Sequence, residues 1–354
     1  MKNKILILGI DTFEAKNIPQ IEEMNKKGYS YYVFTNDQRS VSENYFGSLH
    51  TLNTLIIANK NLLTRAIEFT ELLRKNTFHH VELYAAGRMT FFYLTVCWLY
   101  KIKIITVERG DIGHIQNHGY LTRLAIKTAY KLSNLIWYKE PYMEELIAVH
   151  TSSKKLFFLP NAAPNCKDAQ SSIKEIDFLW VNRFVSQRKS DWLINCLNQN
   201  EFKNCHSLFL GIQENASSTI LDLQKKVQEM NLNKNTLFEG FLDPLPYYLK
   251  SRFFLLPSEI VFGNNSLLEA MSYGVVPIVS ETESTKYIVR NMENGLTFEH
   301  NEAALHDVLL KALNLDTETW LKLSQNAIQT IKEEYSQNKW RQGCQIMYET
   351  LLSY

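Results

Sequence analysis

Short runs of apolar and β-branched residues alternate along the chain with longer segments in which apolar positions recur every three or four residues. The short runs are typical of strands buried on both faces, and the longer segments are typical of amphipathic helices. Their regular alternation predicts parallel sheets covered by helices. Strands are expected at residues 5–8, 31–34, 54–58, 81–84, 104–107, 135–138 and 156–159, and again at 178–181, 207–210, 236–238, 253–256, 275–279 and 296–298.

The alternation stops once, near the middle of the chain. Prolines and serines replace large apolar residues there, which is typical of a linker. The expected fold class is therefore α/β, with two doubly wound Rossmann-like domains facing across a cleft. We expect the first domain at 1–165, the linker at 166–176 and the second domain at 177–334, while residues 335–354 form a helix that packs back toward the first domain.

The most apolar stretch, residues 91–107, contains Lys101 and Lys103. These charges leave too few apolar residues in a row for a membrane span, so we expect a buried helix at 91–100 and a strand at 104–107. The apolar run at the N-terminus is too short for a signal peptide. The five cysteines are scattered and form no C-x-x-C pair, which is typical of reduced thiols. We therefore expect a cytoplasmic protein without a bound metal.

Composition limits the classes of function. A chain of 354 residues is long enough for two domains, each with its own core. A hydrophobic fraction of 45% and a charged fraction of 21% describe a soluble globular protein. The net charge of +1 argues against an extended nucleic-acid-binding surface, so nucleic acid is not an expected partner.

Residues 257–280 have the features of an anion site. Pro257 ends an apolar strand, and Gly263 permits a tight turn. Good N-cap residues follow for a helix that begins at 266 or 267, namely Asn264, Asn265 and Ser266. The free amides of a helix N-terminus attract anions, and open α/β sheets bind ligands above the strand ends. A phosphate-bearing ligand is the first hypothesis; an ordinary, well-capped βαβ unit is the alternative.

Other polar residues lie near the same edge of the second sheet. Arg183 follows strand 178–181, and Lys189 begins the next helix. A planar guanidinium and a point charge together suit a diphosphate. Taken alone, the pair also fits a solvated basic turn. Glu269 lies near the start of the helix after Gly263, where a carboxylate could hold the two hydroxyls of a ribose.

In order and spacing, these motifs resemble those of the large family of retaining glycosyltransferases with the GT-B fold, called family four or glycosyltransferases group 1. The resemblance is close over residues 176–300 and holds only in pattern before that, chiefly at 159–162. It is carried by Arg183, Lys189, Leu208-Phe209-Leu210-Gly211, Phe238-Glu239-Gly240, Pro257-Ser258, Phe262-Gly263, Leu268-Glu269-Ala270-Met271, Gly274 and Asn294-Gly295-Leu296.

The resemblance implies transfer of a sugar from a nucleotide diphosphate with retention of configuration, without a metal or other cofactor. It implies that Arg183 and Lys189 neutralise the leaving diphosphate. Glu269 would hold the ribose, and the base would lie near Gly240 and Leu242; UDP and GDP are not distinguished. The remaining donor-binding residues it implies are Phe262, Gly263, Asn264, Asn265, Ser266 and Leu267.

The chain departs from the family pattern in both halves. The family's first Glu would fall at Val261. Either the loop bulges so that Glu259 reaches the donor sugar and takes this catalytic place, which we expect, or this contact is absent. Strand 104–107 is followed by Glu108 and Arg109, where family members often have a His. We expect these two residues and Gly9 to line the acceptor side, with Glu108 as a catalytic group.

The usual role of the family implies a glycan or lipid-linked glycan acceptor in the synthesis of bacterial surface polysaccharide. The helical segment 121–132 carries Arg123, Lys127 and Lys131 at four-residue spacing. This face either rests on anionic lipid at the inner membrane or is solvated. Two other functions remain open: a catalytically silent paralogue that binds nucleotide sugars or glycans, and a sugar-nucleotide 2-epimerase.

Overall fold

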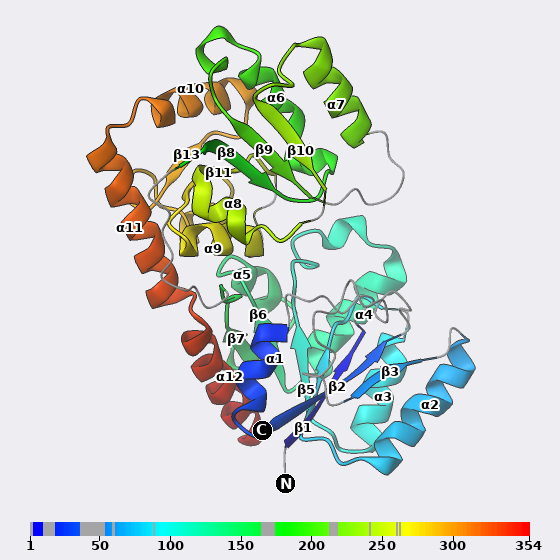
Figure 1. The fold of residues 1–354 in the computed structure, drawn as a ribbon. Helices are drawn as coiled ribbons and strands as arrows, with labels where there is room; N and C mark the ends of the chain where they lie inside the picture. Colours follow the sequence, from blue (N-terminus) through cyan, green and yellow to red (C-terminus); the bar gives the residue numbers. More distant parts are fainter. Residues whose placement is uncertain are drawn as a thin grey trace. The chain divides into compact units, whose positions relative to one another are not determined.

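The structure is a computed structural model that describes residues 3–9, 18–35, 54–58, 61–87, 89–163, 174–211, 219–240, 242–259, 261 and 263–354. The chain divides into two compact units (Figure 1). Unit 1 comprises Met1–Asn161 and Gln337–Tyr354, and unit 2 comprises Ala162–Ser336. Most of the segment expected as a linker, and Phe262, lie outside the described residues.

Unit 1 is built on a seven-stranded parallel sheet in the order β3-β2-β1-β4-β5-β6-β7. Its strands are β1 (Asn3–Leu8), β2 (Tyr29–Thr35), β3 (Thr54–Ile57), β4 (His80–Leu83), β5 (Ile104–Val107), β6 (Leu135–Tyr138) and β7 (Leu156–Phe158). Its helices are α1 (Ile18–Asn25), α2 (Leu62–Lys75), α3 (Thr90–Leu99), α4 (Tyr120–Leu132), α5 (Met143–Ala148) and α12 (Gln337–Leu352).

The strand order decides which helices share a face of this sheet. Connections between parallel strands are right-handed, so the crossovers that run from β3 to β6 place α2, α3 and α4 on one face. Phe69 of α2 packs against Phe92 and Tyr93 of α3, and α3 packs against α4. Helices α1 and α12 contact each other (Figure 1).

The C-terminal helix α12 is held to the sheet of unit 1 by a buried polar cluster. The hydroxyl of Tyr348 donates to Oε1 of Glu82 at 2.7 Å and lies 3.0 Å from the hydroxyl of Tyr31. All three side chains are buried, and the ring of His80 lies 4.5 Å from that of Tyr348. Burial and the charge of Glu82 raise the pKa of Tyr348 well above its usual value, so its hydroxyl remains a donor.

Unit 2 is built on a six-stranded parallel sheet in the order β10-β9-β8-β11-β12-β13. Its strands are β8 (Ile176–Val181), β9 (Ser207–Leu210), β10 (Thr236–Glu239), β11 (Ser251–Leu256), β12 (Val276–Ser280) and β13 (Leu296–Phe298). Its helices are α6 (Ser190–Leu197), α7 (Thr219–Glu229), α8 (Leu245–Lys250), α9 (Asn265–Ser272), α10 (Glu302–Leu313) and α11 (Thr317–Glu334).

Successive residues of the central strands of unit 2 enter two different cores. Phe178 and Trp180 of β8 pack in one core with Phe253 of β11, whereas Leu179 and Phe254 pack in the other. A strand buried on both faces can have no polar face, which explains its continuous apolar run. The thirteen strands predicted from the sequence are all present, with ends shifted by at most two residues.

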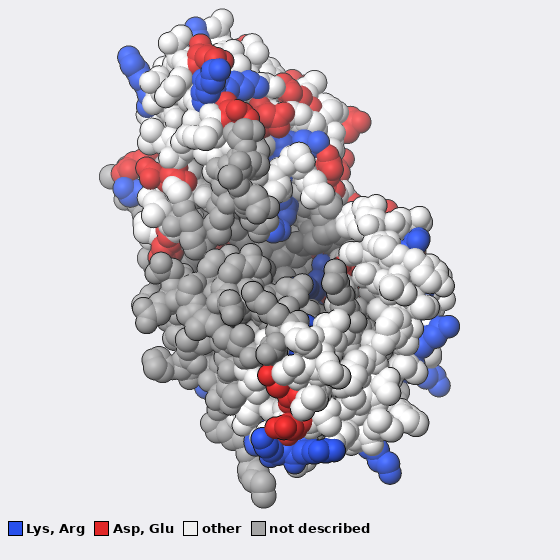
Figure 2. All heavy atoms as spheres, turned by 90° about the vertical axis from the view of Figure 1, so that its right-hand side faces the viewer, with Lys and Arg blue, Asp and Glu red and all other residues white. Residues whose placement is uncertain are grey.

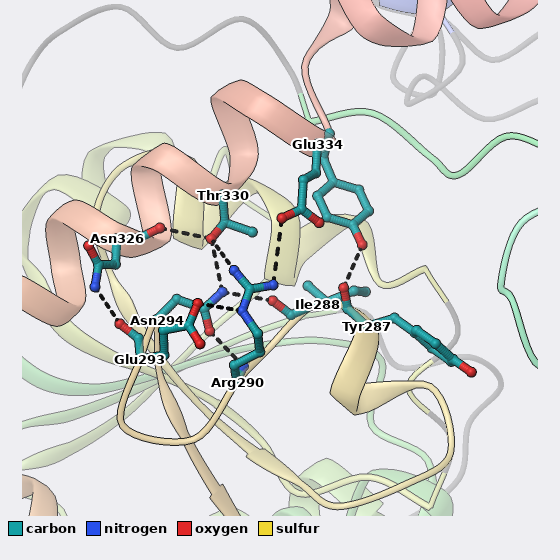
Figure 3. A network of polar contacts seen from close by, with 9 residues as sticks. Tyr287, Ile288, Arg290, Glu293, Asn294, Asn326, Thr330 and Glu334 are labelled. Carbon is teal, nitrogen blue, oxygen red and sulfur yellow. Dashed lines mark hydrogen bonds and ion pairs between the residues drawn. The ribbon is translucent and has the colours of Figure 1, made fainter.

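A polar network fixes the loop between β12 and β13 to helix α11 (Figure 3). The side-chain amide of Asn294, which is fully buried, donates to the carbonyl of Ile288 and to Oγ1 of Thr330. Its oxygen accepts from the amide of Arg290 at 2.7 Å. The guanidinium of Arg290 forms ion pairs with Glu293 and Glu334. The network provides hydrogen-bond partners for backbone groups of a buried turn, which have no partners in a strand ladder.

The prediction for residues 91–107 was correct in its elements and wrong in its burial. Helix α3 and strand β5 are present, but α3 is buried on one side only. Trp98 is 74% exposed and Leu99 is 62% exposed. Sequence hydrophobicity alone cannot separate a helix buried all round from an apolar helix on the surface.

We expect Tyr348→Phe to lower the free energy of unfolding by about 1–3 kcal/mol, because it leaves the buried Glu82 carboxylate without this donor. Denaturation in urea measures the change. Tyr120→Phe is the matched control, because Tyr120 is 70% exposed. Equal losses in the two variants would contradict the assigned role of the buried cluster.

Stability should also depend on pH through His79. Burial, with His80 and Lys103, lowers its pKa from 6.5 to about 4. The unfolded chain therefore binds more protons between these two values, and the protein loses stability as the pH falls through that window. We expect His79→Gln to flatten this part of the curve of urea midpoint against pH. An unchanged slope would show that other groups cause the dependence.

Candidate functional site

The candidate site of unit 2 lies where the strand order of its sheet reverses. The chain runs outward from β8 through β9 to β10 and then returns to place β11 on the other side of β8. Open α/β sheets bind ligands at such a switch point, above the carboxyl ends of the two strands. The segments after these strands contain Arg183 and Ser258.

Arg183 and Arg188 form a cationic pair after β8. Arg183 is exposed, whereas Arg188 is partly buried and its Nη1 donates to Oγ of Ser258 at 2.9 Å. Burial, together with the like charge of Arg183, lowers the pKa of Arg188 to about 10. Two guanidinium groups held close together favour a bound anion, because an anion relieves their repulsion.

Lys189 joins the same cluster in an uncommon backbone conformation. It precedes α6 with φ 48° and ψ 39°, in the left-handed region that few non-glycine residues adopt. Its ammonium group forms an ion pair with Glu259 and lies 5.4 Å from the centroid of the Trp192 ring. The hydrogen bond from Lys189 lowers the pKa of Glu259.

The loop after β11 therefore brings Glu259 to the cationic cluster. The amide of Glu259 also donates to the carbonyl of Gln187 at 3.1 Å, which ties the two loops together. Val261, where the family pattern has its first Glu, is 1% exposed and packs in the core. The structure places a carboxylate two positions earlier in the chain, beside Lys189.

The start of α9 faces the end of β8. Asn264 caps the helix by accepting from the amide of Leu267 at 2.9 Å, and its side-chain amide donates to Oδ1 of Asn182 at 3.2 Å. Gly263 precedes the cap with φ 25°. Asn265 and Ser266, the first two residues of α9, are partly exposed, and Leu267 is buried. The N-terminus of α9 thus lies beside the cationic loop.

Glu269 lies one turn into α9 and is partly exposed. Its Oε2 accepts from the hydroxyl of Tyr248 in α8 at 3.2 Å. Tyr248 is almost fully buried, and burial raises its pKa well above the usual value, so it remains a hydrogen-bond donor to this carboxylate. Tyr248 therefore positions Glu269.

The carboxyl ends of β9 and β10 continue the same edge. A Cβ atom on Gly211 would lie 1.8 Å from the carbonyl oxygen of Asn182, so only glycine allows this close approach. The amide of Gly211 donates to the carbonyl of Gly240 at 3.3 Å. Gly240 and Leu242 are exposed beyond the strand.

The cluster contains two aromatic residues that sequence reasoning did not assign to it. The ring of His300, after β13, is tilted against that of Trp192 with the ring centroids 4.9 Å apart, and its Nδ1 lies 3.0 Å from Oγ of Ser280. Burial lowers the pKa of His300, and Lys189 acts in the same direction while Glu259 opposes it. Trp192 lies in α6 and His300 follows β13, so only the tertiary structure brings the two residues together. Arg188 had a signal in the sequence, because it adjoins Lys189.

The switch point of unit 1 holds two of its three predicted residues. It lies between β1 and β4. Gly9 follows β1 with φ 76°, and a Cβ atom there would lie 2.1 Å from the carbonyl oxygen of Tyr84. The exposed Arg109 stacks on the Tyr84 ring, with its guanidinium carbon 4.8 Å from the ring centroid.

Glu108 occupies a different place from the one expected. Its side chain is buried, and its Oε1 accepts from the amides of Gly110 and Ile112 at 2.7 and 3.2 Å. Its Oε2 accepts from the hydroxyl of Tyr130. Burial raises the pKa of Glu108. One carboxylate oxygen is thus engaged by its own loop and the other by Tyr130 of α4, so Glu108 supports the position of Arg109 and offers no surface to a ligand.

Among the described residues, no group of three His, Cys, Asp or Glu is arranged to hold a metal ion. Within the same ranges, no helix has both the length and the apolar character needed to cross a membrane.

Part of unit 2 matches a known protein family. Residues 175–314 match the family described as Glycosyl transferases group 1. The resemblance seen in the motifs is thereby confirmed for this part of the chain. The match includes the cationic loop after β8, the capped helix α9 and the loop of Asn294.

Glycosyltransferases also appear among similar proteins. Glycogen synthase of Aquifex aeolicus is 30% identical over 123 residues, which are 34% of this chain and 26% of that protein. The match thus spans about a quarter of the relative's length. Two solved structures match at 13% identity: Anabaena HepE in complex with UDP and glucose (TM-score 0.81, covering 100% of both chains) and a Rickettsia africae glycosyltransferase (TM-score 0.78, covering 99% of both). These likenesses confirm the GT-B fold.

The cap of α9 gives a test of the site. Asn264→Ala and Asn301→Ala each remove an Asn cap, of α9 and α10 respectively. We expect each to cost about 1 kcal/mol of stability. Only Asn264→Ala should also reduce the thermal shift produced by UDP or GDP, because only that cap touches Asn182. Equal nucleotide shifts in both variants would remove the α9 N-terminus from the site.

Proposed function

We propose that this protein is a retaining, metal-independent glycosyltransferase that moves a sugar from a nucleotide-diphosphate donor to a glycan or glycolipid acceptor. One observation carries the proposal: Arg183, Arg188 and Lys189 gather beside the N-terminus of α9 at the switch point of unit 2. This arrangement suits a diphosphate. The match of residues 175–314 to glycosyltransferases supports the same reading.

The cationic loop acts on the leaving group. Cleavage of the bond between sugar and diphosphate leaves additional negative charge on the diphosphate, so cations aimed at it stabilise the transition state more than the ground state. Arg183 and Lys189 supply this charge, and Arg188 adds a third cation held by Ser258. Lys189 exchanges its ion pair with Glu259 for one with the donor. In this proposal the side chains do the electrostatic work that a metal does elsewhere.

The other residues orient the donor. Glu269, held by Tyr248, accepts hydrogen bonds from the ribose hydroxyls. The amides at the start of α9 bind phosphate or sugar oxygens. Glu259 lies near the sugar once Lys189 has turned to the diphosphate. The proton of the acceptor hydroxyl passes to the leaving phosphate, so no separate base is assigned.

We place acceptor recognition in unit 1, at the switch point where Gly9, Tyr84 and Arg109 meet. The exposed guanidinium of Arg109 offers hydrogen bonds to a glycan or to its phosphate. Glu108 supports this residue from inside the loop. We propose that the protein works in the cytoplasm on a step of bacterial surface polysaccharide synthesis, where glycans and lipid-linked glycans serve as acceptors.

The donor proposal is tested with Arg183→Ala and Lys189→Ala. Hydrolysis of labelled UDP and GDP sugars is measured first without an acceptor and in the presence of EDTA, which should have no effect. We expect each variant to lower kcat by about 100-fold or more, because each loses a group that stabilises developing charge. Lys225→Ala, an exposed position on α7 paired with Glu229, is the control and should retain the wild-type rate.

A silent paralogue would give a different result. It would show a thermal shift with a nucleotide sugar, which Arg183→Ala abolishes, but no hydrolysis by the wild-type chain. Retained activity in both cationic variants would contradict the proposed role of the loop. Loss of activity in EDTA would contradict independence from a metal.

A further inference from the structure

Helix α3 exposes an apolar stripe on unit 1. Its exposed positions are Phe91, Thr95, Trp98 and Leu99, which follow the spacing of one helix face. Tyr93, Leu94 and Cys97 on the opposite side are buried in the unit. The most exposed of these side chains is Trp98, whose exposed fraction is 74%. Indole rings are favoured where an apolar phase meets water.

Helix α4 continues the exposed surface and adds positive charge. Tyr120 is 70% exposed and Leu121 is 71% exposed, and Leu124 follows on the same side. Lys127 and Lys131 continue this side toward the C-terminal end. The exposed side of α4 is therefore apolar in its first half and basic in its second. Its other side, with Ile126 and Tyr130, is buried.

The two stripes lie on the same side of the sheet. Helices α3 and α4 connect β4, β5 and β6 in one direction, so right-handed crossovers place both helices on one face, where they pack together. Their outward sides therefore share one surface. In the lower half of Figure 2, a broad white area lies between lysine and arginine side chains at the right-hand edge and a group of acidic and basic side chains nearer the centre.

Negative charge is absent from this pair of helices. Neither α3 nor α4 contains Asp or Glu, and Lys101 follows α3 directly. Between the helices, Glu108 is buried and Asp111 pairs with His118. Exposed aromatic and leucine side chains beside lysines match the two layers of an anionic bilayer surface, which are acyl chains and headgroups.

We propose that the α3–α4 face, formed by Phe91, Trp98, Leu99, Leu121, Leu124, Lys127 and Lys131, is a docking surface for anionic lipid membrane. It extends the proposed function, whose acceptors include lipid-linked glycans, by naming the surface that holds the protein at the membrane. A second copy of the chain is the weaker occupant. A two-fold interface through this face would bring the lysines of both copies together without an opposing acid on either helix.

Sedimentation with vesicles tests the surface. The full chain should pellet with vesicles of phosphatidylcholine and phosphatidylglycerol, and much less with phosphatidylcholine alone. Lys127→Gln with Lys131→Gln should weaken binding roughly 30-fold, at about a factor of five for each lysine near an anionic surface. Leu99→Gln with Leu121→Gln should weaken binding to the same vesicles at high salt, where the charge contribution is screened.

Each pair has a matched control in unit 2. Lys311→Gln with Lys322→Gln makes the same charge change at exposed positions. Leu221→Gln with Leu321→Gln replaces two exposed leucines. Both controls should bind like wild type.

Two results would overturn the proposal. The first is pelleting that is independent of phosphatidylglycerol or is lowered equally by a control pair. The second is a dimer, measured by light scattering, that Leu99→Gln with Leu121→Gln dissociates while wild-type protein does not pellet. Donor hydrolysis needs no membrane, so failure of the docking surface and failure of the glycosyltransferase proposal give different results.

Discussion

The pairing of β8 with β11 is the constraint on which the candidate site depends. Phe178 pairs with Phe253, so the ladder joins two segments far apart in the chain and sets their carboxyl ends side by side. Every later contact follows from this register: Arg188 reaches Ser258, Glu259 reaches Lys189, and Asn264 reaches Asn182. Apolar burial on both faces of these strands stabilises the register, because a slip by one residue would exchange the two cores.

The site concentrates positive charge at a cost in free energy that a ligand can relieve. Burial and Arg183 together lower the pKa of Arg188 to about 10, so its charged form is less favourable than in water. Glu259 partly compensates by pairing with Lys189. Such a cluster does not stabilise the fold but suits an anion, because the favourable electrostatic free energy appears only when the anion is bound. Unit 1 shows the opposite case in Glu108, whose carboxylate is fully occupied by its own loop and by Tyr130 of α4.

Particular residues show how far the sequence predicted the site. Arg183, Lys189, Asn264 and Glu269 were identified because each lies at a strand end or a helix start, which are local features. Glu108 was predicted to line the acceptor side because the local sequence shows that it follows β5. Its burial against Tyr130 depends on a distant part of the chain and could not be predicted in this way. Trp192 and His300 were missed, since nothing in their own segments indicates that α6 and the end of β13 meet. The hydrophobic pattern predicted helix α3, but it did not indicate that Trp98 would face outward.

By itself, the sequence determined the thirteen strands, their parallel arrangement and the capped helix start within residues 257–280. Apolar runs, caps and turn residues act over a few positions, so their effects can be read in order along the chain. Only the tertiary structure decided which strands are neighbours, which carboxylate pairs with Lys189 and which side of α3 is exposed. These outcomes depend on long-range packing and burial. The same local pattern is compatible with many strand registers, and each register would bring different residues together.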